Sequence, residues 1–383
     1  MKILAVCIGP TDGGCVSYFY RRIICELALS NEVDVLCSTP SQSDFANIRN
    51  FYCLPYSKKE QGWSRRFVRW FGTTPISRRW GEAAANIVAN DYDVVLSMTS
   101  SIHLDAVVCG RCVAERKGCK FAIYTVDAIP APGGWTRRRS EFRGKMKVVA
   151  RNFAAADYLA ASNSHMLAYQ LGLFKHKEGL VSDVVYTVAP ENYIHTPASD
   201  EILFLYTGEL YGLRNPDHFF KAFRRLLKVY PTAEFMIVGR KKRLGNMKSI
   251  LNAEEQKQII VGSHTSDLAP LFSRAMVLVD IDADREKDPF LSSKIVTYMQ
   301  INRVILSETG RETPSRELFA GMNTVVQCHH DEESLYEGML RAIEVARSNP
   351  DFSERDRLNR SFTAESVTAV LERGLQSLLK QHK

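Results

Sequence analysis

The segment EILFLYTGELYGLRNPDHFFKAF (201–223) is the clearest indication of the fold, because it contains one complete strand-to-helix unit of an α/β sheet. Its apolar run ends at Gly208 and predicts a buried strand. Asn215 then has the character of a helix N-cap, with Pro216 in the first helical position. Arg214 therefore precedes a helix N-terminus, where a guanidinium offers forked donors to phosphate oxygens. The alternative is a surface arginine paired with a nearby carboxylate.

A second segment, FLSSKIVTYMQINRVIL (290–306), has the same layout. Ser292 and Ser293 predict the start of a helix that contains Lys294, and the run at 304–306 predicts the next strand. Serine hydroxyls, free backbone N–H groups and an ammonium in one helical turn favour an anion. An ordinary capped helix with a solvated lysine is the alternative.

Short apolar, β-branched or aromatic runs recur along the first half, separated by segments long enough for helices. They lie at residues 2–9, 32–38, 51–55, 92–98, 120–127 and 158–163. After a turn-rich segment at 184–200 the rhythm restarts with runs at 201–208, 233–239, 258–264, 276–282 and 303–309. This alternation predicts two doubly wound parallel α/β sheets. We place the domain boundaries at 1–192 and 193–362, with a separate C-terminal helix at 363–383.

The composition agrees with a globular protein: 383 residues exceed what one core usually covers, and 45% are hydrophobic and 24% charged. No run of about eighteen apolar residues occurs, and Gly9-Pro10 interrupts the start before it could serve as a signal peptide. We therefore expect a cytoplasmic protein with reduced thiols. Cys109 and Cys112 have the spacing of metal or redox sites, and packing within a helix is the alternative that we favour.

A glycine pair, Gly13-Gly14, follows the first predicted strand and leads into an amphipathic helix. Paired glycines let the backbone approach a phosphate or sugar without side chains in the way. In open α/β sheets ligands bind at such places, outside the carboxyl ends of the strands. An ordinary strand-to-helix turn is the alternative.

Together, these three segments resemble the family-4 retaining glycosyltransferases of the GT-B fold (glycosyl transferases group 1). Three further stretches are similar to the family's last N-domain strand and helix, its interdomain linker and its nucleotide-base region: ASNSHMLAYQLG (161–172), VVYTVAPENY (184–193) and SHTSDLAPLFSRAMVLVDID (263–282). The resemblance implies two Rossmann-like domains that face each other across a cleft. It implies that the N-terminal domain binds the acceptor, that the C-terminal domain binds the nucleotide sugar, and that the last helix crosses back to the N-terminal domain.

The resemblance assigns neutralisation of the donor diphosphate to Arg214 and Lys294. It assigns further donor contacts to Gly13, Gly14, Gly208, Asn215, Asp288, Ser292, Ser293 and Thr297. One departure concerns the ribose, which the family usually holds with a glutamate where this chain has Thr297. The companion acidic position falls at Pro289, with Asp288 beside it as a substitute. Ribose recognition and the identity of the base therefore stay open.

Breaking a sugar–diphosphate bond develops negative charge on the leaving phosphate, which Arg214, Lys294 and the amides near Gly14 would stabilise without a metal or other cofactor. Asp280-Ile281-Asp282 has the spacing of a metal-binding D-x-D motif, but we favour a structural or sugar-contacting role at a buried strand end. For the reacting centre, the N-terminal candidates are Asp127 and His103. An ordinary histidine at a helix start is as consistent with the pattern.

The net charge of +7 is concentrated in two stretches, 58–80 and 137–151, each with seven basic residues and one acidic residue. The first is interleaved with tryptophans and phenylalanines, which suits an anionic membrane surface. We expect reversible attachment to the inner face of the cell membrane through Arg65, Arg66, Arg69 and Trp70. A solvated basic face is the alternative. Nucleic acid is not expected, since no helix-turn-helix, zinc-finger or RNP-like signature occurs.

The sequence thus predicts a glycosyltransferase for hexosyl or related transfer. Its donor would be a nucleotide-diphosphate sugar and its acceptor a glycan or lipid-linked glycan in surface polysaccharide biosynthesis, with retention and without metal. Two alternatives remain: a catalytically inactive membrane-associated partner protein of the same fold, and a GT-B sugar-nucleotide epimerase. The epimerase would need an acid/base constellation that the sequence does not display.

Overall fold

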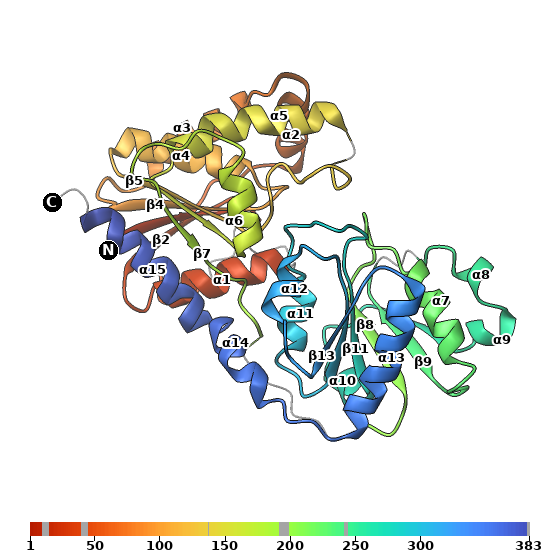
Figure 1. Cartoon of the computed structure of the whole chain (residues 1–383). Coiled ribbons are helices and arrows are strands. Elements are labelled where there is room, and N and C mark those ends of the chain that lie inside the picture. The colour runs from red at the N-terminus through yellow and green to blue at the C-terminus, as the bar shows by residue number, and fades with distance from the viewer. Residues whose placement is uncertain (10–14, 40–44, 137, 191–198, 241–243, 381–383) are drawn as a thin grey trace. The chain divides into compact units, whose positions relative to one another are not determined.

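The computed structural model describes residues 1–9, 15–39, 45–136, 138–190, 199–240 and 244–380 (Figure 1). Backbone contacts divide the chain into two compact units, Met1–Val188 with Phe362–Lys383, and Ala189–Ser361. Each unit is built on a parallel sheet, which confirms the predicted fold class of two α/β domains.

The first unit contains a seven-stranded sheet in the order β3-β2-β1-β4-β5-β6-β7. Its strands are β1 (Lys2–Val6), β2 (Glu32–Cys37), β3 (Asn50–Cys53), β4 (Val94–Thr99), β5 (Lys120–Thr125), β6 (Tyr158–Ala161) and β7 (Val181–Val184). Strand β4 is buried throughout, as expected for a central strand covered on both faces. The sequence did not predict β7, because this short edge strand, VSDV, has two adjacent polar residues in its middle and none of its residues is fully buried.

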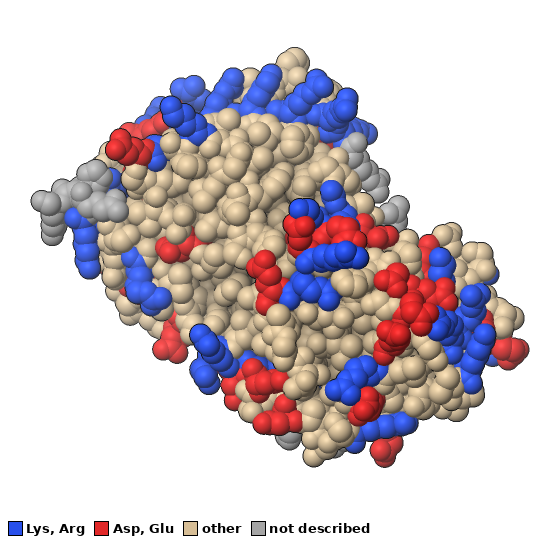
Figure 2. Space-filling model, viewed as in Figure 1, with Lys and Arg blue, Asp and Glu red and all other residues tan. Residues whose placement is uncertain are grey.

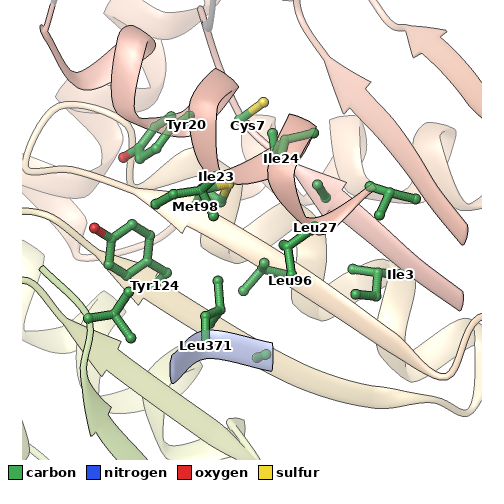
Figure 3. Close-up of a cluster of buried hydrophobic side chains, with 14 of the residues drawn as sticks. Ile3, Cys7, Tyr20, Ile23, Ile24, Leu27, Leu96, Met98, Tyr124 and Leu371 are labelled. Carbon is green, nitrogen blue, oxygen red and sulfur yellow. The ribbon is translucent and has the colours of Figure 1, made fainter. Parts of the chain in front are cut away.

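Helices cover both faces of this sheet. They are α1 (Cys15–Leu27), α2 (Lys58–Phe71), α3 (Pro75–Ile87), α4 (Asp105–Lys117), α5 (Arg139–Asn152), α6 (Ser164–Leu171) and the last helix, α15 (Ala364–Lys380). Figure 3 shows the core on one face, where Ile23 of α1 and Leu371 of α15 meet Leu96 of β4. A separate core on the other face lies under α3, α4 and α5. The chain's last helix therefore completes the hydrophobic core of the unit in which the chain begins.

The second unit contains a six-stranded parallel sheet in the order β10-β9-β8-β11-β12-β13. Its strands are β8 (Leu203–Thr207), β9 (Glu234–Val238), β10 (Ile259–Gly262), β11 (Val277–Ile281), β12 (Val304–Glu308) and β13 (Val325–Cys328). Its helices are α7 (Asp217–Leu226), α8 (Met247–Ile250), α9 (Ala253–Gln256), α10 (Ala269–Arg274), α11 (Ser293–Tyr298), α12 (Pro314–Leu318), α13 (Glu332–Arg347) and α14 (Asp356–Ser361).

Helix α7 is held on the sheet by aromatic residues. Phe219 and Phe223 lie one turn apart and pack on Phe235 of β9, with ring centroids 4.2 and 6.2 Å away. This packing fixes the start of the helix, and it corrects the predicted cap. Pro216, with φ −81° and ψ 6°, occupies the N-cap position, and Asn215 lies one residue outside, where its side chain accepts a hydrogen bond from the Asp217 N–H (3.3 Å).

Cys109 and Cys112 lie on α4, as the helix-packing interpretation expects. Cys109 is buried where α4 crosses α3, and a Cβ on Gly81 of α3 would lie 2.9 Å from the Cys109 Cα. Each cysteine that the structure describes is a free thiol. Within the described residues no group of three or more His, Cys, Asp or Glu side chains could hold a metal ion.

Candidate active site

The two predicted cations, Arg214 and Lys294, lie in one cluster at the carboxyl ends of β8 and β11. Arg214 belongs to the loop after β8, and Lys294 is the second residue of α11, which follows β11. Each cation interacts electrostatically with the same two carboxylates, Asp280 and Asp282. Burial lowers the pKa of Lys294, and the charge of Arg214 lowers it further. Two segments that are far apart in the sequence thus supply one positively charged site.

Gly208 makes room for the lysine. Its φ of +121° is a conformation that side chains rarely adopt, and its N–H donates to the Val238 carbonyl oxygen at 2.7 Å. A Cβ at this position would lie 3.0 Å from Cδ of Lys294. The glycine therefore ends β8 and leaves space for the lysine side chain.

The Lys294 side chain is 12% exposed and its Nζ lies 3.6 Å from Oδ1 of Asp280, which is fully buried. The same Nζ lies 5.1 Å from the ring centroid of Tyr206. Burial, with Arg214 nearby, lowers the pKa of the ammonium to about 8, although Asp280 and Asp282 act in the opposite direction. Lys294 is thus a cation at neutral pH whose charge is sensitive to its surroundings.

Arg214 is half-buried, and its guanidinium lies 5.0 Å from the ring centroid of Tyr211. Its backbone bridges to Ala283 and donates to the Tyr211 carbonyl oxygen at 3.1 Å. Burial alone would lower the pKa of Arg214, but Tyr211 and Asp282 raise it above its ordinary value. Arg214 also lines an open pocket with Asn215 and Asp284. It is therefore a permanent cation that reaches solvent.

Asp280 belongs to β11 and Asp282 directly follows this strand, two residues further on, and both are buried. Asp280 Oδ1 accepts a hydrogen bond from Ser292 Oγ, and Asp282 Oδ1 accepts one from the Ala283 N–H, both at 2.9 Å. Among the described residues, the second oxygen of each carboxylate has no hydrogen-bond partner. Burial, with Asp280 nearby, raises the pKa of Asp282 to about 7. These carboxylates balance the charges of Arg214 and Lys294, and each keeps one oxygen that can accept a hydrogen bond from a ligand.

The other predicted donor residues fall around this cluster. Ser292 is the N-cap of α11, but its hydroxyl binds Asp280 instead of capping the helix. Ser293 begins the helix, and its carbonyl oxygen accepts a hydrogen bond from Thr297 Oγ1 at 3.4 Å. Asp288 is buried, accepts from the Phe290 N–H at 2.9 Å and helps to raise the pKa of Asp282. Gly13 and Gly14 lie outside the described residues.

Sequence reasoning missed three aromatic residues of this site, Tyr206, Tyr211 and Tyr298. Tyr298 holds the end of β8, since its hydroxyl accepts from the Thr207 N–H at 2.8 Å and lies 2.9 Å from Thr207 Oγ1. Tyr206 and Tyr211 lie beside the cations, as described above. One signal was available: Tyr206 and Tyr211 flank the glycine that ends the strand, within the same loop-bearing segment as Arg214.

The two N-terminal candidates, Asp127 and His103, belong to the first unit and follow the carboxyl ends of the neighbouring strands β5 and β4. Asp127 follows β5, and its Oδ2 accepts a hydrogen bond from the Ser101 N–H at 2.9 Å. His103 lies in the same loop after β4, where its carbonyl oxygen accepts from Thr99 Oγ1 at 3.0 Å. The structure thus joins the loops that carry these two side chains.

The predicted membrane residues lie on α2, which begins with a capping box formed by Ser57 and Glu60. Trp63 and Trp70 are 42% and 53% exposed, and Phe71 is also exposed. Arg66 lies 4.8 Å from a Trp63 ring centroid and Arg69 lies 5.2 Å from that of Trp70. Figure 2 shows Lys and Arg side chains gathered over the helices α2, α3 and α5. No helix in the described part of the chain is long and apolar enough to cross a bilayer.

No protein-family model matches this chain, and no curated protein matches it in sequence. Solved structures do match. A glycosyltransferase from Rickettsia africae is 13% identical with a TM-score of 0.66, and the match covers 99% of this chain and 98% of that one. HepE from Anabaena, solved with UDP and glucose, is 12% identical with a TM-score of 0.64 over 98% of this chain and 100% of that one.

The lipopolysaccharide outer core galactosyltransferase WaaB in its apo form is also 12% identical, with a TM-score of 0.64 over 98% of this chain and 99% of that one. At these identities the likeness concerns the fold. The chain has the two-domain, Rossmann-like GT-B fold.

Proposed function

We propose that this GT-B-fold protein is a glycosyltransferase that moves a hexosyl or related sugar from a nucleotide-diphosphate donor to a glycan or lipid-linked acceptor in surface polysaccharide biosynthesis. The observation that carries the proposal is the shared cluster of Arg214 and Lys294 at the carboxyl edge of the second unit's sheet. Proteins of similar fold, HepE among them, have been solved with UDP-sugars. Two cations suit the negative charge of such a ligand's diphosphate.

The reaction follows from the charges at the cluster. When the bond between sugar and diphosphate breaks, the leaving phosphate gains negative charge, and two fixed cations stabilise it most where water is excluded. Arg214 is charged throughout the physiological pH range, and Lys294 is charged below about pH 8. We propose electrostatic catalysis by these two side chains without a metal.

We further propose retention by same-face substitution, in which the leaving phosphate helps to deprotonate the acceptor hydroxyl. A separate base is then not required. Asp127 and His103 are the candidates to contact the sugar or acceptor from the first unit, because their loops are tied together through Ser101. The unpartnered oxygens of Asp280 and Asp282 are available to sugar hydroxyl groups.

A screen of nucleotide diphosphates for thermal stabilisation tests this proposal, followed by slow hydrolysis of the matching sugar nucleotide. One nucleotide diphosphate should raise the unfolding temperature of the wild type, and Arg214→Ala and Lys294→Ala should abolish that increase. Lys257→Ala is the matched control, since Lys257 is an exposed cation of the same unit that pairs only with Glu254 in the described structure. The proposal is wrong if no nucleotide protects the wild type, or if all three variants respond alike.

We also propose peripheral, reversible attachment of the first unit to the inner, cytoplasmic face of the cell membrane. Arg65, Arg66, Arg69 and Trp70 lie on one helix with exposed aromatic rings, a combination that suits the interface of an anionic bilayer. A lipid-linked acceptor would reside at that surface.

A further inference from the structure

The first unit contains a pocket of about 280 Å³ between α2, α5 and the loop after β4. Its lining includes three apolar side chains, Val68, Ile102 and Leu104. Four cations also line it, namely Arg65, Arg66, Arg69 and Lys145. Apolar surface and positive charge thus occur together in one concave site.

A glycine sets the shape of this pocket. A Cβ on Gly144 of α5 would clash with the Val68 carbonyl oxygen and lie 3.1 Å from the Arg69 Cα, so α2 and α5 pack with their backbones in contact. Lys145, the next residue, is therefore held against α2, and its side chain is only 16% exposed. Two helices from distant parts of the sequence supply the cations.

The charges in the pocket are not balanced. Asp105 is buried and accepts hydrogen bonds from Ser64 (2.5 Å), Ser77 and Tyr56 (3.3 Å), and its burial raises its pKa. Glu141 pairs with Lys145 at 2.9 Å. Arg65, Arg66 and Arg69 form no ion pair with any carboxylate of the described chain. An excess of positive charge therefore lies beside apolar surface, which suits an anionic amphiphile.

The pocket has two neighbours of functional interest. Trp63 and Trp70 extend exposed aromatic surface along the same helix, toward which a hydrocarbon chain can continue. On the other side, Ser101 lines the pocket while its N–H binds Asp127, and His103 lies between the lining residues Ile102 and Leu104. A head group in the pocket would lie close to the candidate reacting side chains.

We propose that this pocket binds the phosphate or diphosphate head group of a lipid. Arg65, Arg69 and Lys145 hold the phosphate oxygens, and the first carbons of the chain contact Ile102 and Leu104. The inference rests on the proposed function, because it identifies the acceptor as a glycan carried on a lipid phosphate. It differs from attachment to a membrane surface in requiring a defined site.

The test uses farnesyl diphosphate as a soluble probe, with inorganic pyrophosphate and farnesol as its separate halves, and follows tryptophan fluorescence. Farnesyl diphosphate should bind at least about tenfold more tightly than either half. Arg69→Ala and Lys145→Ala should each weaken it about tenfold, as expected for the loss of one charge-assisted contact. Ile102→Asn should weaken the binding of farnesyl diphosphate and leave the binding of pyrophosphate unchanged. Comparison with dioctanoyl phosphatidic acid then distinguishes a prenyl from an acylglycerol phosphate.

The matched control is Lys59→Ala, which removes an exposed cation of the same helix outside the pocket. The proposal is overturned if Lys59→Ala weakens binding as much as Arg69→Ala, or if pyrophosphate binds as tightly as farnesyl diphosphate. Unfolding temperatures of all variants should match the wild type, since the replaced side chains are at least partly exposed.

The same variants separate this inference from the proposed function. Nucleotide stabilisation should be unaltered in Arg69→Ala and Lys145→Ala, because both residues belong to the first unit, whereas Arg214 and Lys294 belong to the second. If the wild type ignores every nucleotide but binds farnesyl diphosphate through Arg69 and Lys145, the proposed function fails and the lipid phosphate site stands. If nucleotides bind and farnesyl diphosphate does not, the lipid phosphate site fails and the proposed function stands.

Discussion

The cations of the second unit and those of α2 contact aromatic rings at nearly equal distances, but those of the second unit also lie beside buried carboxylates. Lys294 and Arg214 lie 5.1 and 5.0 Å from tyrosine ring centroids, while Arg66 and Arg69 lie 4.8 and 5.2 Å from tryptophan ring centroids. Lys294 is nearly enclosed and faces a buried carboxylate, whereas the α2 arginines have no carboxylate partner in the described chain. Similar contacts between a cation and an aromatic ring therefore occur in two different electrostatic environments.

Burial explains the difference. In a site shielded from water, charges interact strongly and change one another's pKa, whereas exposed charges act over a surface and are screened by salt. The cluster of the second unit suits a small anion held in one orientation. The basic face of α2 suits a large anionic surface, beside the pocket in which we propose that Arg65 and Arg69 hold a lipid head group.

The largest effect is expected from removing either cation of the second unit's cluster. Arg214→Ala or Lys294→Ala should lower the rate of donor hydrolysis by about 10²–10³-fold, as for the loss of one electrostatic stabiliser of a leaving group. Raising the salt concentration should change this rate little in the wild type. The assigned role in stabilising the leaving group is wrong if either variant keeps more than a tenth of the wild-type rate while Lys257→Ala is unaffected.

Removal of the α2 cations should weaken membrane binding and leave donor hydrolysis unchanged. Replacing Arg65, Arg66 and Arg69 together by glutamine should weaken sedimentation with anionic vesicles about a hundredfold, at about 1 kcal/mol per cation, and high salt should do the same to the wild type. The control replaces three exposed lysines of the second unit with the same loss of charge: Lys248, Lys257 and Lys287. An equal loss in the control would show that net charge alone drives binding.

The burial of Asp282 should appear in the pH dependence of stability. Its pKa is about 7 in the folded protein, above the ordinary value of 3.8, so the folded state binds an extra proton between these values. Wild-type stability should therefore fall from about pH 4 to pH 7, by at most about 1.4 kcal/mol per pH unit, relative to Asp282→Asn. Unfolding temperatures at pH 5 and pH 8 measure this, with the exposed Asp267→Asn as control. If the unfolding temperatures of the wild type and Asp282→Asn depend on pH in the same way, Asp282 does not have a raised pKa in the folded protein.

The smallest effect is expected from titrating Lys294. Because its pKa is about 8, the ammonium loses its proton as the pH rises through that value. Affinity for the stabilising nucleotide diphosphate should fall about tenfold between pH 7.5 and pH 9.5. Lys294→Arg should remove this dependence, since arginine stays charged over that range. A wild-type affinity that is flat across it would show that Lys294 is not a diphosphate ligand.

Much of the fold could be read from the sequence, because buried strands are local apolar runs. The strand predicted to end at Gly208 ends at Thr207, directly before this glycine, and the runs of both halves form parallel sheets. Two local features were harder to predict. The polar edge strand β7 has no distinctive pattern, and the start of α7 moved by one residue because the packing of Phe219 and Phe223 sets where the helix begins.

The sequence by itself determined the two parallel-sheet domains, the loop and helix that carry Arg214 and Lys294, and the concentration of cations on 58–80 and 137–151. Only the tertiary structure decided that Arg214, Lys294, Asp280 and Asp282 act on one another, and that Lys145 of one helix lines a pocket with Arg69 of another. The physical reason is that strand and helix periodicity is local, whereas burial, and the charge interactions that depend on it, arise only when distant segments pack together.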